Sequence, residues 1–245
     1  MERFRTIFLL AGLGFFGFSF VAMGLSSYTL AGKEQVLTVE QLIERDGIIE
    51  EFYDLQARWP EAFQKHYGEP KTEAEWKQAY AKALRYGRDV YVSEACWHCH
   101  SQFVRPVSNE ELRFGPVSNA LEYQNELQQP VLFGTRRVGP DLIRESKVRP
   151  NDWHAAHFYR PKFTAPTSVM PDFPWFFDEP DPKAVAKAKK DKAEPPPPTP
   201  NRRGLALITY VQWLGSWRRN PDYTWQEEWP PKKPGKGKAA KEGAP

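Results

Sequence analysis

The sequence is short of sulfur. Only two of its 245 residues are cysteine and three are methionine. Two cysteines, Cys96 and Cys99, cannot form the disulfide framework of a small secreted scaffold. They also fall short of the four thiolates that usually hold an iron–sulfur cluster. These two classes of protein are therefore excluded, and the few sulfur-bearing residues can be considered one by one.

The chain also lacks a strong charge of either sign. Its 34 basic and 31 acidic residues leave a formal net charge of +3, which is too small to indicate a nucleic-acid partner. After residue 33 it has no apolar run long enough to cross a bilayer. We therefore expect one membrane-spanning segment at most.

One long apolar run does exist, at the beginning of the chain. Residues 7–25 carry no charge, and Arg3 and Arg5 precede them. About 20 apolar residues cross a bilayer core, and a basic flank stays in the cytoplasm. The pattern predicts a cytoplasmic segment at 1–6 and a transmembrane anchor at 7–28. The rest of the chain would lie on the other side of the membrane. A signal peptide cleaved after Thr29-Leu30-Ala31 is the alternative, although signal sequences usually have shorter apolar regions.

Residues 96–100 read CWHCH, the attachment signature of c-type haem. Cys96 and Cys99 stand one helical turn apart, so both thiols can reach the vinyl groups of one porphyrin as thioethers. His100 follows at once and can offer an imidazole nitrogen to the iron. The pattern predicts one covalently bound haem c.

A zinc site is the alternative for the same cysteines, with His154 and His157 as further ligands. Paired histidines in such sites are usually separated by three to five residues. Here two residues separate them, and His100 would have no role. The spacing therefore favours haem.

The second axial ligand follows nearly by elimination. Met1 is the initiator and Met23 lies in the apolar run, which leaves Met170 for a soluble domain. Prolines at 166, 171 and 174 stiffen its loop. A thioether held in this way is typical of His/Met cytochromes. His154 and His157 are the rival ligands, and their spacing prevents both from pointing at one iron.

The sequence Gly139-Pro140-Asp141-Leu142 lies between the haem motif and the methionine loop. Alone it would be a turn. In this position the Pro140 carbonyl can accept a hydrogen bond from the second ring nitrogen of His100, which fixes the tautomer of a metal-bound histidine.

The periodicity of the rest predicts a mainly α-helical fold. We expect a helical extension at 33–86, with breaks near Gly47 and Pro60 and a helix that starts at a capping box at Thr72 and stops at Gly87. A class I cytochrome c-like domain follows at 87–217. It contains a solvated low-complexity insertion at 178–200 with a polyproline stretch at 195–198, and a final core helix from 202. A disordered basic tail is expected at 218–245.

Four ordered blocks resemble the mono-haem cytochrome c subunit, subunit II, of cbb3-type haem–copper oxidases. They are GRDVYVSEACWHCHSQFVRP (87–106), RRVGPDL (136–142), NDWHAAHFYRP (151–161) and SVMPDFPW (168–175). The final YVQWLG (210–215) is similar to the family's last helix. Ala95 departs from the pattern, because the family usually has glycine there. It would be a mild change on a helix.

The resemblance implies a single-pass protein of the bacterial inner membrane with its domain in the periplasm. Its partners would be the catalytic haem–copper subunit and the other cytochrome c subunit. The implied haem residues are Cys96, Cys99, His100 and Met170. Arg105, Arg136 and Arg137 lie in the matching blocks and are candidates for pairing with the haem propionates, or they are solvated.

Three functional hypotheses follow. The chain is the electron-transfer subunit of a terminal oxidase, a free-standing membrane-tethered cytochrome, or a zinc-stabilised interaction module. With His100 and Met170 on both sides of the iron, no position is left for oxygen. We therefore expect no oxygen-reducing centre in this chain.

Overall fold

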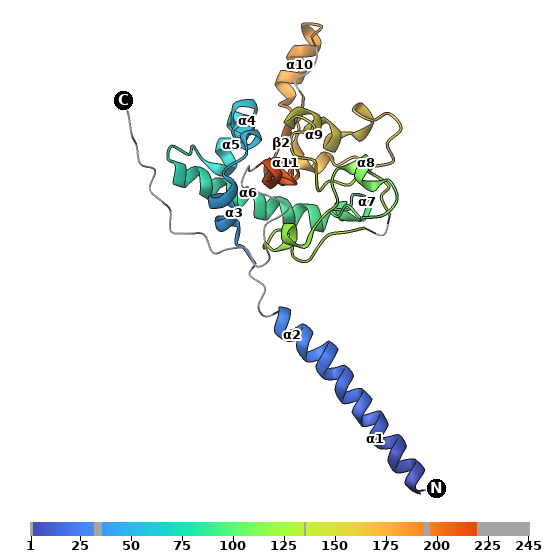
Figure 1. Cartoon of the computed structure of the whole chain (residues 1–245). Coiled ribbons are helices and arrows are strands. Elements are labelled where there is room, and N and C mark those ends of the chain that lie inside the picture. Colours follow the sequence, from blue (N-terminus) through green and yellow to red (C-terminus); the bar gives the residue numbers. More distant parts are fainter. Residues whose placement is uncertain (1, 32–35, 135, 194–196, 220–245) are drawn as a thin grey trace.

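The computed structural model describes residues 2–31, 36–134, 136–193 and 197–219. Within these ranges the chain is mainly helical, which confirms the predicted class. Figure 1 shows a long N-terminal helix that stands clear of a folded helical domain.

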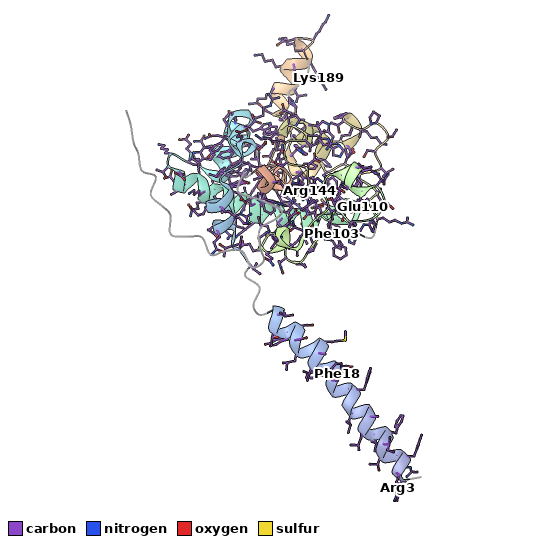
Figure 2. All side chains as sticks on the ribbon, viewed as in Figure 1. Arg3, Phe18, Phe103, Glu110, Arg144 and Lys189 are labelled. Carbon is purple, nitrogen blue, oxygen red and sulfur yellow. The ribbon has the colours of Figure 1, made fainter. Side chains whose placement is uncertain are left out.

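The N-terminal helix runs without a break from Glu2 to Ala31. It comprises α1 (Glu2–Ser19), the π-helical turn η1 (Phe20–Leu25) and α2 (Ser26–Ala31). None of its side chains is buried, and residues such as Phe18 point into open space (Figure 2). The helix is long and apolar enough to cross a membrane. It extends beyond the predicted anchor 7–28 at both ends.

Three short helices follow in the predicted helical extension. They are α3 (Val39–Asp46), α4 (Glu50–Arg58) and α5 (Pro60–Tyr67). Gly47 ends the first with a φ of 77°, and Trp59-Pro60 separates the other two, so both predicted breaks are confirmed. Their apolar faces bury Leu42, Phe52 and Phe63 in the same core as the rest of the domain.

Two helices cross at the centre of the domain, α6 (Glu73–Ser93) and α11 (Arg202–Trp213). The capping box at Thr72 and Glu75 is present as predicted. The predicted stop at Gly87 is wrong, because α6 continues for six more residues. A Cβ at Gly87 would lie 2.1 Å from the Ala206 carbonyl oxygen. Glycine is therefore needed here for the close approach of α11 rather than for a helix end.

A long irregular segment follows the short helix α7 (Cys96–Cys99). The helical elements among its described residues are α8 (Glu110–Phe114) and η2 (Ala120–Tyr123). Buried ion pairs hold this segment. Arg137 contacts Glu110 at 2.6 Å and Asp141 at 3.2 Å, and Arg144 contacts Glu122 at 2.5 Å. Figure 2 shows Glu110 and Arg144 within the folded body. The Asp141 carboxylate also accepts from the amides of Phe103 and Ile143, at 3.0 and 2.9 Å, and so satisfies backbone groups that have no regular partner.

The chain then forms α9 (Asn151–Tyr159), η3 (Pro161–Phe163) and η4 (Pro174–Phe176). The predicted insertion at 178–200 is not simply solvated loop. Strands β1 (Phe177–Asp178) and β2 (Thr199–Pro200) pair antiparallel at its base, and α10 (Pro182–Lys190) projects from the domain (Figure 1). Alanine and lysine are both good helix formers. Residues 195 and 196 of the predicted polyproline stretch lie outside the described residues.

The last described element is η5 (Ser216–Arg219), in which Trp217 is buried. Residues 218 and 219 of the predicted disordered tail therefore belong to a helical turn. The remainder of that tail lies outside the described residues.

Candidate haem site

The haem motif begins at a turn in the left-handed region. Ala95, between α6 and α7, has φ 57° and ψ 27°. The prediction that Ala95 lies on a helix is therefore wrong. The left-handed conformation explains why the family usually has glycine at this position. An L-residue in this conformation costs roughly 1 kcal/mol. The turn lets α7 leave the axis of α6, so that Cys96 and Cys99 face a neighbouring cavity.

This cavity has a volume of about 550 Å³, within the usual range for small-molecule and cofactor sites. It brings together all five residues that the sequence predicted for the haem, its axial ligands and their support: Cys96, Cys99, His100, Pro140 and Met170. Three separate segments supply them. The other lining residues are mostly apolar, with Leu142, Phe158 and Leu207 among them.

The ring of His100 is held from one side. Its Nδ1 lies 3.0 Å from the Pro140 carbonyl oxygen. A carbonyl can only accept, so Nδ1 carries the proton and the lone pair is on Nε2. A Cβ at Gly139 would lie 2.3 Å from Cε1 of this ring, so only glycine fits. Burial lowers the pKa of His100, which favours the neutral imidazole that binds a metal.

The methionine loop is fastened to two helices on the C-terminal side of Met170. The Met170 amide donates to the Ser168 hydroxyl at 3.2 Å, and the Phe173 amide donates to the Phe158 carbonyl of α9 at 3.0 Å. The Asn201 side chain, at the start of α11, donates to the Trp175 carbonyl at 3.0 Å. Met170 is thus placed on the cavity wall by two helices.

Glu94 connects this loop to the haem motif. It is the last residue before the Ala95 turn and lines the cavity. Its carboxylate accepts from the indole N–H of Trp175 at 3.3 Å and forms an ion pair with Arg203 of α11. One side chain therefore joins α6, the methionine loop and α11.

The sequence matches one protein-family model, described as cytochrome c oxidase, mono-heme subunit/FixO, over residues 67–195. The match covers more than half of the chain. The chain belongs to this family. The resemblance to subunit II of cbb3-type oxidases is therefore confirmed. A comparison with curated proteins gives no significant match.

The FixO family is described as the mono-haem subunit of a cytochrome c oxidase. The chain is therefore a subunit of such an oxidase and has one haem. The matched region begins just before α6 and includes the haem motif, the Pro140 turn and the methionine loop. The matched region therefore contains all five residues that the sequence predicted for the haem and its support.

Both rival histidines also line the cavity. His157 is engaged through Nδ1, which lies 2.6 Å from the Thr164 hydroxyl, and its ring stacks on Trp153 at 4.5 Å. His154 is 2% exposed, and its Nε2 has no hydrogen-bond partner among the described residues. Burial lowers its pKa to about 3. Burial also lowers the pKa of His157 to about 4, so both rings are neutral at physiological pH.

The zinc alternative finds no support in the geometry. Within the ranges that the structure describes, no three side chains of histidine, cysteine, aspartate or glutamate are grouped so that they could hold a metal ion.

The predicted propionate partners lie elsewhere. Arg105, Arg136 and Arg137 are not among the residues that line the cavity. Arg105 and Arg137 pair with Glu110, and Arg136 is exposed. The arginine that does line the cavity is Arg149, which the sequence analysis missed. Its nearness to the NDWHAAHFYRP block (151–161) was the available signal.

Proposed function

We propose that this chain is a membrane-anchored mono-haem c-type cytochrome. It passes single electrons from a donor cytochrome c to the haem–copper core of a cbb3-type terminal oxidase. The observation that carries the proposal is the cavity itself, because it gathers Cys96, Cys99, His100 and Met170 from separate segments beside apolar walls.

The residues present fit a haem c. Cys96 and Cys99 would hold it through thioethers, and His100 and Met170 would take the axial positions. The Pro140 carbonyl would keep Nε2 of His100 available. A bound haem supplies a one-electron ferric–ferrous couple. The apolar walls would exclude water, and the hydrogen bonds from the methionine loop to α9 and α11 would keep the geometry nearly constant when the charge changes.

The mouth of the cavity suits electron exchange with another protein. Val138 and Val169 line the cavity and are 56% and 77% exposed. The cofactor edge would thus lie close to an apolar surface, where a partner can approach. We propose that the catalytic haem–copper subunit and the other cytochrome c subunit are the partners.

The N-terminal helix would keep the domain beside those partners. Arg3 and Arg5 precede its apolar part and favour a cytoplasmic N-terminus, which puts the domain in the periplasm of a bacterial inner membrane. Intact mass of the native protein tests this anchor. We expect the helix to be retained, and a mature chain that begins near Gly32 would contradict it.

The experiment that tests the function is oxygen consumption by membranes in which Cys96 and Cys99 are both serine, with a soluble cytochrome c as donor. We expect turnover to be lost while the catalytic subunit still co-purifies in mild detergent. Full turnover in an assembled complex would show that this haem is not on the electron path. Failure of the wild-type chain to co-purify with a haem–copper protein would favour the free-standing cytochrome.

A further inference from the structure

The cavity wall carries a polar cluster that none of the proposed ligands uses. Glu145 and Arg149 precede α9, and His154 lies on it. The Arg149 guanidinium contacts the Glu145 carboxylate at 2.7 Å and lies over the Trp153 ring, 4.4 Å from its centre. A carboxylate and an aromatic face therefore orient this side chain at the cavity.

The Arg149 guanidinium has N–H groups that no described residue accepts from. A guanidinium has five N–H groups, and of the described residues only Glu145 accepts from them. The side chain is 33% exposed and lines the cavity. Among the described residues that line this cavity, Arg149 is the one with a permanent positive charge.

His154 is the second observation. Its ring is 2% exposed, yet Nε2 has no hydrogen-bond partner among the described residues, and the nearest carboxylate oxygen, on Glu145, is 3.8 Å away. A buried polar atom without a partner costs about 1–3 kcal/mol. Such an atom on a cavity wall indicates a polar group of a ligand.

We propose that Arg149, with Nε2 of His154 beside it, binds a carboxylate of the haem. A propionate enters a largely apolar cavity only at high cost unless a cation pairs with it. A guanidinium is the side chain best suited to bind a carboxylate with two hydrogen bonds. The inference rests on the proposed function and replaces Arg105, Arg136 and Arg137 in this role, since none of the three lines the cavity.

The test is the reduction potential of the haem-loaded full chain in detergent. Without the Arg149 charge, the propionate is no longer neutralised and the ferric state is favoured. We expect Arg149→Gln to shift the ferric-to-ferrous ratio at a fixed applied potential by about tenfold, which is about 59 mV for one electron. Covalent haem content should not change. Arg58→Gln, at the exposed ion pair between Arg58 of α4 and Asp152 of α9, is the matched control and should leave the potential unchanged.

Three further measurements separate binding from a general structural effect. Arg149→Lys keeps the charge and should restore part of the potential. Glu145→Gln removes a negative charge and should raise the potential, whereas a disturbed fold would lower it in both variants. The propionate bending band in the resonance Raman spectrum should shift in Arg149→Gln.

An unchanged potential and Raman band in Arg149→Gln would overturn the inference, as would a shift in Arg136→Gln instead. A fall in the potential of Glu145→Gln would also overturn it. All of these outcomes require a chain that carries haem. A wild-type chain without haem would instead contradict the proposed function.

Discussion

The close crossing of α6 and α11 can be tested by adding a methyl group at Gly87, because the nearest atom on the facing helix belongs to its backbone. A Cβ at this position would lie 2.1 Å from the Ala206 carbonyl oxygen and 2.7 Å from Cβ of Tyr210. An ordinary carbon–oxygen contact is about 3.3 Å. In Gly87→Ala the helices must therefore separate by roughly 1.2 Å, the difference between 3.3 and 2.1 Å.

The cost of that separation can be compared with the gain in helix propensity. Overpacking a core costs about 1–3 kcal/mol, and the upper end applies where neither contact can rotate away. Alanine gains about 1 kcal/mol over glycine within a helix. We therefore expect a net loss of roughly 2 kcal/mol, which lowers the Tm of a domain of this size by about 4–8 °C.

The assay is thermal unfolding of the haem-loaded chain, followed by far-ultraviolet circular dichroism. Lys82→Ala is the matched control, because Lys82 is an exposed residue of the same helix. A Tm for Gly87→Ala equal to or above that of the control would refute the close approach of the two helices.

Three further predictions concern the ligand loop and the surface. Met170→Ala should leave the haem covalently bound but remove the strong-field sixth ligand, so the potential should drop; an unchanged spectrum and potential would point to His154 or His157. Glu94→Gln weakens a charge-assisted contact to the methionine loop and should destabilise the domain by about 1–2 kcal/mol. Its methionine-to-iron charge-transfer band should also be weaker, and full intensity of that band would contradict the proposed link. Arg85 binds both carboxylate oxygens of Glu40 at 2.7 Å and lowers the pKa of that carboxyl to about 2. Because the pKa is lower in the folded state, this stabilisation is present above pH 4.5 and is lost as the pH falls toward 2. The pair is exposed, so Glu40→Gln, which leaves the Arg85–Glu126 pair in place, should cost less than about 1 kcal/mol at pH 7 in denaturant unfolding and nothing near pH 2. A pH-independent difference would argue against the ion pair.

Local sequence signals predicted the elements that depend on neighbouring residues. The capping box at Thr72, the breaks at Gly47 and Pro60 and the apolar N-terminal helix all follow from short-range patterns. Five of the residues that line the cavity were also predictable, because the spacing of CWHCH, the turn at Pro140 and the scarcity of methionine each point to specific chemistry.

Features that depend on distant contacts were not predictable. Gly87 looks like a helix end in the sequence, and only the position of α11 shows that it allows a close crossing. Arg149 is one of many arginines until the fold brings it to the cavity. The helix α10 was missed because its alanine and lysine content is equally typical of a solvated loop.

The most direct test of the central claim is the intact mass of the purified full chain under denaturing conditions, together with its pyridine haemochrome spectrum. The account predicts one haem that remains attached after denaturation, a spectrum of the two-thioether c type, and loss of both when Cys96 and Cys99 are replaced by serine. A chain with the mass of the polypeptide alone, or haem that is retained in the double serine variant, would contradict it.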